Sequence, residues 1–332
     1  MANASALDPR LSPLFLAGPT AVGKSEIALL LAEKIRGEII SVDSMQVYRG
    51  LDIGTAKPSA EERARVPHHL IDVVALTESF DAAQFVRLAS DAVPDIQSRD
   101  RVPIFCGGTG LYFKAFLEGL GDTPPADAQL RTQLEATPLP ELLRELAERD
   151  RVTFDKIDQK NPRRVVRAIE VIRLTGKKIS EQRAEWSTLG PPASRRRVDP
   201  NGPAGETPAL PGANRIIGFS RENADLQARI NARVDAMFAR GLVEETRRLL
   251  EHGLAQNKTA LQALGYRQVV DHLRGERGLP ETIELVKIKT RQFAKRQMTW
   301  FRRHGNCEWI ELKPGNSYEK LLNCLTLNKC KE

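Results

Sequence analysis

Cysteine is scarce in this chain of 332 residues, and the few present form no metal-binding pattern. The four cysteines are Cys106, Cys307, Cys324 and Cys330, and none of them lies in a C-x-x-C pair. The three near the C-terminus have no accompanying cluster of histidines. Zinc sites need closely spaced ligands, and stable disulfides need an oxidising compartment. We therefore expect reduced thiols and no zinc site.

Long apolar runs are also missing. No segment approaches the roughly 20 consecutive apolar residues that a membrane-spanning helix needs. Residues 1–13 have neither the basic start nor the apolar run of a signal peptide. We therefore expect a cytoplasmic protein without a membrane segment.

The charge balance is moderately basic. The chain has 50 lysines and arginines against 43 aspartates and glutamates, a formal net charge of +7. This excess favours a polyanionic partner, although many basic enzymes bind no nucleic acid. The length allows two domains, or one large domain with an insertion.

Short apolar runs alternate with segments of helical periodicity, and this alternation indicates the fold class. Residues 14–17 enter a glycine turn, and residues 25–35 then carry apolar side chains at helical spacing. Further strands are predicted at 39–42, 70–74, 102–106 and 215–219. Such alternation is typical of an α/β fold with a mostly parallel sheet flanked by helices. Ligands of these sheets bind beyond the carboxyl ends of the strands, where Gly18, Asp43 and Gly107 fall.

The sequence changes in character near residue 121, which indicates that the sheet domain is interrupted. Residues 122–127 are rich in proline, and residues 130–183 have helical patterns with few strand signals. Residues 191–213 contain proline, glycine and three successive arginines without apolar periodicity. Helices are again expected at 224–250 and 285–304. We predict a discontinuous catalytic core (1–121 and 214–316), an inserted all-helical domain (122–190), a flexible linker (191–213) and a tail (317–332).

Residues 18–25 match the phosphate-loop pattern G-x-x-x-x-G-K-[ST], between a predicted strand and a predicted helix. Backbone N–H groups of such a loop converge on a phosphate, and the helix N-terminus adds the positive end of its dipole. The lysine supplies a charge, and the serine supplies a hydroxyl ligand for Mg²⁺. We expect a P-loop NTPase-like core whose Ser25 binds the metal and whose diphosphate-containing ligand is held by Gly18, Pro19, Thr20, Ala21, Val22, Gly23, Lys24 and Ser25.

Asp43 closes the second predicted strand, so the parallel order should bring its carboxylate beside the phosphate loop. Its position alone allows three roles: Mg²⁺ ligand, general base, or N-cap of a following helix. A phosphate loop alone would suggest nucleoside triphosphate hydrolysis or a small-molecule kinase.

Further motifs follow in order along the chain. After GPTAVGKS (18–25) come SVDSMQVYRGLDIGTAKP (41–58), PHHLID (67–72), GGTGLYF (107–113), NPRRVVRAIEV (161–171), LGYRQ (264–268) and TRQFAKRQMTWFR (290–302). Together they resemble the bacterial tRNA dimethylallyltransferase family, also called tRNA isopentenyltransferases. The resemblance runs from residue 14 to about residue 312 and fails in 191–213 and in the tail.

This resemblance implies transfer of a dimethylallyl group from dimethylallyl diphosphate to N6 of the adenine just 3′ of the anticodon in tRNA. The phosphate loop would hold the diphosphate leaving group, with Mg²⁺ and Lys24 neutralising its developing charge. Asp43 matches the family's general base, and such catalysis is typically worth ~10²–10⁴ in rate. Arg221 matches a family arginine near the diphosphate, although a solvated arginine at a helix start is an equally good interpretation of that position.

The target adenine must leave the stack of the anticodon loop to reach the donor. The resemblance places Asp43, Ser44, Met45, Gln46 and Thr109 beside this base, and Thr109 joins Asp43 and Lys24 in the catalytic set. The surrounding RNA would be contacted by Arg131, Arg163, Arg164, Val165, Val166, Arg167, Gln262, Ala263, Leu264, Gly265, Tyr266 and Arg267.

Residues 287–303 contain seven basic residues and no acidic one. Lys287, Arg291 and Lys295 recur every four residues and would share one face of a helix. A basic face is often only solvated, but beside the family resemblance we expect this one to contact RNA phosphates.

Three other functions stay open at this point. An adenylate isopentenyltransferase would use the same donor with a free nucleotide, a P-loop small-molecule kinase would require ATP, and a non-catalytic RNA-binding protein would use the loop as a nucleotide switch. The helical insertion and the basic helix favour RNA, because neither is needed to hold a free nucleotide. Nothing in the sequence requires more than a monomer.

Overall fold

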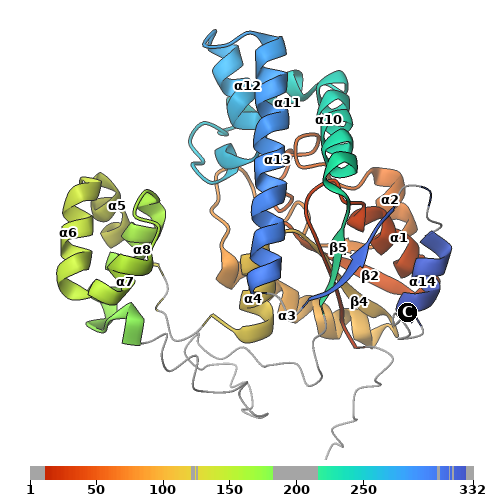
Figure 1. The fold of residues 1–332 in the computed structure, drawn as a ribbon, viewed down its shortest axis with the longest axis horizontal. Helices are drawn as coiled ribbons and strands as arrows, with labels where there is room; N and C mark the ends of the chain where they lie inside the picture. The colour runs from red at the N-terminus through yellow and green to blue at the C-terminus, as the bar shows by residue number, and fades with distance from the viewer. Residues whose placement is uncertain are drawn as a thin grey trace, which may run out of the picture. The chain divides into compact units, whose positions relative to one another are not determined.

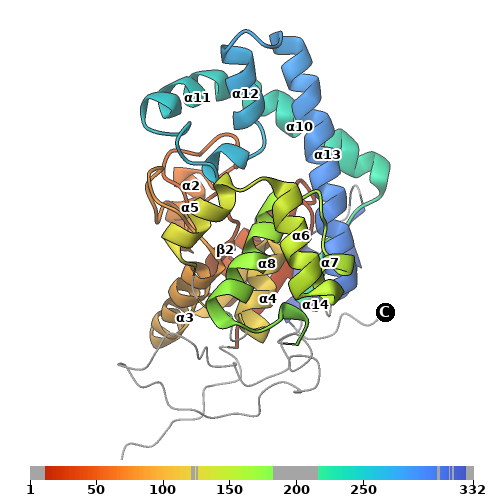
Figure 2. The same ribbon diagram turned by 90° about the vertical axis from the view of Figure 1, so that its left-hand side faces the viewer.

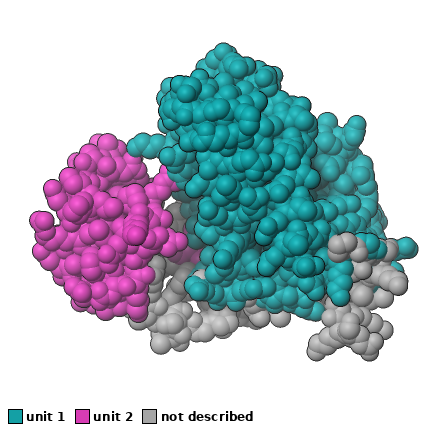
Figure 3. Space-filling view, turned by 45° about the horizontal axis from the view of Figure 1, so that its top comes forward, with its two compact units in different colours: residues 1–117, 212–332 teal, residues 118–211 magenta. Residues whose placement is uncertain are grey.

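The protein divides into two compact units, which are described separately. The computed structural model describes residues 12–120, 124, 126–181, 216–304, 307–313, 315 and 318–326. Unit 1 comprises residues 1–117 and 212–332, and unit 2 comprises residues 118–211 (Figure 3). This division falls near the predicted boundaries at 121 and 214. The linker predicted at 191–213 lies outside the described residues.

Unit 1 is built on a parallel sheet of six strands within the described residues. Their order across the sheet is β3 (His68–His69), β2 (Gly37–Val42), β4 (Val102–Gly107), β1 (Leu14–Ala17), β5 (Ile216–Ser220) and β6 (Cys307–Glu311). The predicted α/β class with a parallel sheet flanked by helices is confirmed (Figure 1).

One predicted strand is wrong. Residues 70–74 were expected to be extended, but the strand there is the short β3 that precedes them. Leu70 and Asp72 have φ values of 60° and 59°, which is left-handed backbone incompatible with a strand. Val74 makes only an isolated bridge to Tyr48.

Alternation along the central strands supplies both faces of the sheet with apolar side chains. Leu16 and Ile104 belong to the core that includes the buried side of α1 (Lys24–Ile35). On the opposite face, the rings of Phe15 and Phe105 stack with centroids 4.9 Å apart, and both contact Phe116 of α4 (Gly110–Glu118). Helix α3 (Ala82–Ser98) packs against α4 through Phe85 and Tyr112, whose ring centroids are 4.5 Å apart.

The sequence predicts a tail at 317–332, but part of this segment is folded against the core. Residues 318–326 form helix α14 (Tyr318–Thr326), which packs on α1. Its Leu322 and Leu325 are buried in the sheet core, and Lys34 Nζ donates to Asn323 Oδ1. Apolar residues at helical spacing explain this docking, so the prediction is wrong for the described residues of this segment.

A group of helices extends from one end of the sheet (Figures 1 and 2). It contains α10 (Asn223–Ala239), α11 (Leu242–Glu251), the 3₁₀ turn η2 (Ala260–Gln262), α12 (Tyr266–Leu273) and α13 (Leu279–His304). The helix predicted at 224–250 is divided at Gly241, whose φ of 96° is left-handed. Long α13 runs from this group to the sheet. A short helix, α2 (Ala60–Arg65), precedes β3.

Unit 2 is helical in its described residues, as predicted. Its helices are α5 (Ala128–Ala136), α6 (Leu139–Arg149), α7 (Arg151–Lys156) and α8 (Pro162–Thr175). Leu134, Leu146 and Ile169 are fully buried in a small core of its own. Helix α8 begins with Pro162 after the Asn161 cap, and it ends at Gly176 with φ of 68°.

Across both units, no helix of the described residues is both long enough and apolar enough to cross a membrane.

Candidate active site at the phosphate loop

The loop between β1 and α1 has the backbone of a phosphate-binding loop. Ala21 and Gly23 have φ values of 63° and 107°, so the chain turns tightly before α1 begins at Lys24. Lys24 Nζ donates to Pro19 O at 3.2 Å, which keeps the ammonium against the loop. Burial lowers the pKa of Lys24, the positive charge of Arg233 adds to this effect, and the negative charge of Asp43 opposes it.

A cavity of about 520 Å³ opens over this loop. Lys24 and Ser25 line it from the loop side, and Arg229 and Arg233 line it from α10. Arg229 Nε also donates to Ala21 O at 3.0 Å. Burial lowers the pKa of Arg233, although an arginine stays protonated at neutral pH. Glu26 and Glu62 also line this cavity of ligand size, and its three cations are the candidate contacts for a small polyanion.

Arg221 lies against the phosphate loop. Its side chain is buried, its Nε donates to Val22 O at 2.7 Å, and its Nη1 pairs with Asp225 at 2.8 Å. It does not line the cavity over the loop. Arg221 therefore holds the phosphate loop through Val22 O, and its predicted place near the diphosphate stays a prediction.

The ends of three adjacent strands bring the predicted catalytic residues to the loop. Gly107 of β4 is the register partner of both Ala17 of β1 and Val42 of β2, so all three strands end at one level. A side chain at Gly107 is excluded, since a Cβ there would lie 2.1 Å from Val42 O. Asp43 and Thr109 therefore leave the sheet beside the phosphate loop.

Asp43 caps the turn that follows it with one carboxylate oxygen, Oδ1, and leaves Oδ2 available to a ligand. Its Oδ1 accepts hydrogen bonds from Met45 N at 2.8 Å and Gln46 N at 3.3 Å. Its Oδ2 accepts none from any residue in the described part of the chain. Thr109 Oγ1 accepts from Ser44 N at 3.1 Å, so Thr109 is tied to the same turn. The arrangement leaves a carboxylate oxygen for a proton from a ligand.

Cys106 lies under Lys24 and is a free thiol. Burial raises its pKa to about 11, with the positive charge of Lys24 opposing this effect. The thiol is therefore neutral at physiological pH and serves as packing.

Gln297 was not identified from the sequence. Its Oε1 accepts from Thr20 N at 2.9 Å, and its Nε2 donates to Gly108 O at 3.0 Å. A Cβ at Gly108 would lie 2.1 Å from this amide, so the glycine is required for the approach. A single glutamine in a basic helix does not indicate from sequence that it will bind two distant backbone groups. The four-residue spacing of Arg229 and Arg233 could have marked one helical face.

The predicted RNA-contacting segment 262–267 is partly interior. Gln262 and Arg267 are exposed, but Ala263, Gly265 and Tyr266 are buried. The side chains of Ala263 and Tyr266 pack inside unit 1 and are not exposed for RNA contact.

The predicted basic face of α13 is also partly occupied. Lys287 pairs with Asp235 and Glu284, each at 2.8 Å, and Arg291 Nη1 donates to Asn231 at 2.6 Å. These two residues join helices, whereas Lys295 is exposed.

In unit 2, the predicted RNA contacts fall into two groups. Arg163 and Arg164 are exposed on α8, but Val165 and Val166 are buried in the core. We therefore correct the assignment of Val165 and Val166, because their side chains pack inside unit 2.

Arg131 and Arg167 both pair with Oε2 of Glu170, at 2.6 and 2.7 Å. Glu170 is fully buried, and burial alone would raise its pKa. The hydrogen bonds and charges of the two arginines outweigh burial and hold the pKa below its ordinary value. Both arginines, each partly exposed, are thus held in fixed positions.

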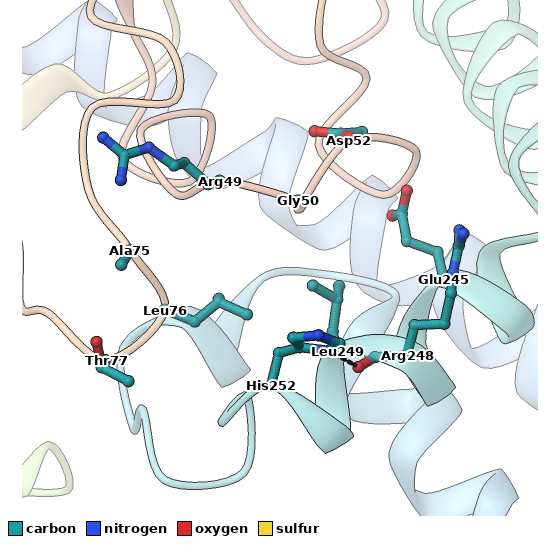
Figure 4. A pocket seen from close by; sticks show the side chains of 10 residues that line it. All are labelled: Arg49, Gly50, Asp52, Ala75, Leu76, Thr77, Glu245, Arg248, Leu249 and His252. Carbon is teal, nitrogen blue, oxygen red and sulfur yellow. Dashed lines mark hydrogen bonds between the residues drawn. The ribbon is translucent and has the colours of Figure 1, made fainter.

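A second cavity of about 520 Å³ lies in unit 1 between residues 49–52, residues 75–77 and α11 (Figure 4). Of its acidic side chains, Glu245 binds Ile53 N and Asp52 pairs with Lys57. Its lining contains no residue of the phosphate loop. The cavity over the phosphate loop is the better candidate for the anionic substrate, because the loop itself, Arg229 and Arg233 line it.

The parallel sheet, the loop and the cations above it place the chain in the class of P-loop α/β proteins. A family model described as IPP transferase matches residues 46–304. The tRNA dimethylallyltransferase 1 of Citrifermentans bemidjiense is 42% identical over 93% of this chain and 94% of its own length. That of Geobacter metallireducens is 44% identical over 89% of this chain and 90% of its own. This chain belongs to the IPP transferase family.

Solved structures agree with this assignment. The tRNA isopentenylpyrophosphate transferase of Bacillus halodurans superposes with a TM-score of 0.65 at 36% identity, covering 96% of this chain and 98% of that one. A eukaryotic dimethylallyltransferase acting on tRNA gives a TM-score of 0.74 at 26% identity, covering 96% of this chain and 80% of that one.

Proposed function

We propose that this protein transfers a dimethylallyl group from dimethylallyl diphosphate to N6 of the adenine 3′ of the anticodon in tRNA, releasing diphosphate. Relatives named as tRNA dimethylallyltransferases match it over most of its length. The structural observation that supports the proposal is the cavity over the phosphate loop, where Lys24, Arg229 and Arg233 meet. Asp43 does not line this cavity, but its charge acts on both Lys24 and Arg233.

The diphosphate would be held by the loop N–H groups and by Lys24, Arg229 and Arg233. As the bond between the prenyl C1 and the bridging oxygen breaks, negative charge grows on the diphosphate. These donors are already in place and stabilise that charge without rearrangement. They favour departure of the leaving group more than binding of the intact donor.

Magnesium fits this cavity as a partner of the diphosphate. Among the described residues, no group of three or more His, Cys, Asp or Glu side chains is arranged to hold a metal. The Ser25 hydroxyl lines the cavity and is a hard oxygen ligand, and Mg²⁺ commonly completes its shell with phosphate oxygens and water. Bound there, Mg²⁺ would neutralise charge on the leaving diphosphate.

Asp43 would act as the general base. The adenine N6 is a weak nucleophile because its lone pair is delocalised into the ring. As N6 bonds to C1, Asp43 Oδ2 would take one N6 proton, while Oδ1 stays fixed by Met45 and Gln46. Thr109, tied to Ser44, would orient the base from the other side.

The RNA would be held by exposed basic residues, with Arg163, Arg164 and Arg267 the best placed by exposure. Arg131 and Arg167, fixed by Glu170, would present their remaining donors to phosphates. We place the reaction in the cytoplasm, with the monomer as the acting form.

The test uses purified protein with radiolabelled dimethylallyl diphosphate and either tRNA or AMP, with and without ATP. We expect label in tRNA, without any need for ATP and with dependence on Mg²⁺. Label in AMP alone would instead support an adenylate isopentenyltransferase, and a strict ATP requirement would support a kinase. Binding of tRNA should weaken steeply with salt, because phosphate contacts release counterions.

A further inference from the structure

Two buried side chains hold the loop at residues 51–57 from the helical side of unit 1. Both carboxylate oxygens of Glu245, on α11, accept from Ile53 N, at 3.0 and 3.1 Å. The Tyr266 hydroxyl, on α12, accepts from Gly54 N at 3.1 Å and donates to Glu245 Oε1 at 2.6 Å. Two side chains from different helices therefore bind two successive backbone N–H groups.

The contact of Glu245 and Tyr266 with the loop at 51–57 is closely packed and shielded from solvent. Tyr266 is 0% exposed and Glu245 is 5% exposed. A Cβ at Gly54 would lie 2.4 Å from the Tyr266 ring, so only glycine admits the ring at this distance. Burial raises the pKa of the Tyr266 hydroxyl, and the charge of Glu245 adds to this effect, so the hydroxyl stays protonated and donates. A buried carboxylate is tolerated only with such partners.

The other side of the same loop holds Gln46. Its Nε2 donates to Thr55 O at 3.1 Å and to Ala56 O at 3.3 Å. Its Oε1 accepts from Ser41 Oγ at 2.8 Å. Gln46 is also one of the two residues whose N–H binds Asp43 Oδ1. A displacement of residues 53–56 would therefore reach the carboxylate of Asp43 through one side chain.

Lys57 fixes the end of the loop independently. Its buried Nζ contacts Asp52 Oδ1 at 2.7 Å, Tyr48 O at 2.6 Å and Asp72 Oδ1. Asp72 N in turn donates to Gln46 O at 3.1 Å. The loop is thus fixed at both ends, which makes it a rigid support for the turn that carries Asp43.

We propose that Glu245 and Tyr266 are positioning residues that hold the loop at 51–57, and through Gln46 the turn bearing Asp43, in register with the acceptor base. Tyr266 then acts through the protein and makes no contact with RNA. This inference rests on the proposed function for its kinetic consequence, but its structural part can be tested without activity.

The principal variant is Tyr266→Phe, which removes the hydroxyl and keeps the ring. The matched control is Thr246→Val, which removes a buried hydroxyl from the same helix as Glu245. Within the described residues, the Thr246 hydroxyl bonds only the carbonyl of Leu242, one turn earlier, so the control leaves the loop at 51–57 untouched. Both variants are compared with wild type by amide hydrogen exchange and by steady-state kinetics with tRNA and dimethylallyl diphosphate.

We expect Tyr266→Phe to speed exchange in peptides covering 51–57, and Thr246→Val to leave it unchanged. Turnover by Tyr266→Phe should fall on the order of tenfold, since small misplacements of reacting groups are costly. The KM for the donor and the affinity for tRNA should both stay within about twofold, because the phosphate loop and the RNA surface are intact. Glu245→Gln, which keeps an acceptor for Ile53 N, should lose less turnover than Glu245→Leu.

Two results would overturn the inference: unchanged exchange at 51–57 in Tyr266→Phe, or weakened tRNA affinity at normal turnover, which would make Tyr266 an RNA contact. Failure of wild type to modify tRNA would overturn the proposed function instead, and the exchange comparison would still decide whether the loop is held as described.

Discussion

The side-chain oxygen of Gln297 accepts a hydrogen bond from the backbone N–H of Thr20 at 2.9 Å, across 277 residues of sequence. Its amide nitrogen binds Gly108 O at 3.0 Å. One buried side chain thus joins the phosphate loop to the turn that carries Thr109. The relative position of donor and acceptor sites therefore depends on α13.

Replacing Gln297 by leucine should weaken donor binding. The change leaves Thr20 N and Gly108 O without partners, at a cost of about 1–3 kcal/mol in stability. We expect the KM for dimethylallyl diphosphate to rise several-fold, as steady-state kinetics would show. Gln292→Leu, at an exposed position of the same helix, is the control. Equal effects of the two substitutions would refute a specific role for Gln297.

Arg233→Met should impair use of the donor far more than binding of tRNA. The substitution keeps much of the apolar stem but removes a half-buried cation from the cavity over the loop. A charged hydrogen bond lost there corresponds to about 1.5–3 kcal/mol, or a decrease on the order of tenfold or more in kcat/KM for the donor. Arg240→Met, at the exposed end of α10, should leave this value near that of wild type. A normal kcat/KM for Arg233→Met would exclude it from diphosphate binding.

Asp43→Asn should lower turnover by about 10²–10⁴ while leaving the affinity for tRNA nearly intact. Asparagine keeps an oxygen that can cap Met45 N and Gln46 N, so the turn should persist. Single-turnover kinetics and a filter-binding titration would separate the two quantities. A large loss of affinity at unchanged turnover would contradict the role of general base.

The ion pairs of Glu170 should make unit 2 sensitive to acid. The folded-state pKa of Glu170 lies below its ordinary value of 4.5, so its stabilising contribution is complete above that pH. The contribution is lost as pH falls through the folded-state pKa, when the carboxylate is protonated. Wild type should exceed Glu170→Gln in stability by about 1–3 kcal/mol at neutral pH, allowing for the partial exposure of both arginines.

Urea denaturation of the full chain, followed by circular dichroism from pH 7 to pH 3, would measure this difference. The gap between wild type and Glu170→Gln should narrow below pH 4.5. A gap that stays constant with pH would show that the carboxylate charge of Glu170 is not responsible.

Local patterns predicted the parts of the fold that local chemistry determines. The strand at 14–17, the loop and α1 are dictated by an apolar run, two glycines and helical periodicity, and all three are present. The prediction of a strand at 70–74 was wrong because Leu70 and Asp72 adopt left-handed backbone, which their residue types do not predict. Helix α14 was not predicted because its few apolar residues are buried only through tertiary packing against α1, which a local pattern does not show.

Site residues at the ends of parallel strands could be predicted from the sequence. Site residues that reach the loop through packing of distant helices could not. Asp43 and Thr109 follow from parallel topology. Arg233 and Gln297 reach the loop from helices far along the chain, and no local pattern specifies such approaches. Val165 and Val166 show the converse error, since a motif shared with a family includes residues that only maintain its core.

The late position of α13 bears on how this protein is made. The phosphate loop and Asp43 leave the ribosome early, but the helix that ties Thr20 to Gly108 is synthesised 277 residues after Thr20. A nascent chain that ends before α13 contains the phosphate loop and Asp43 but lacks Gln297, which joins Thr20 to Gly108. The contact between Thr20 and Gln297 therefore forms only after α13 has been synthesised.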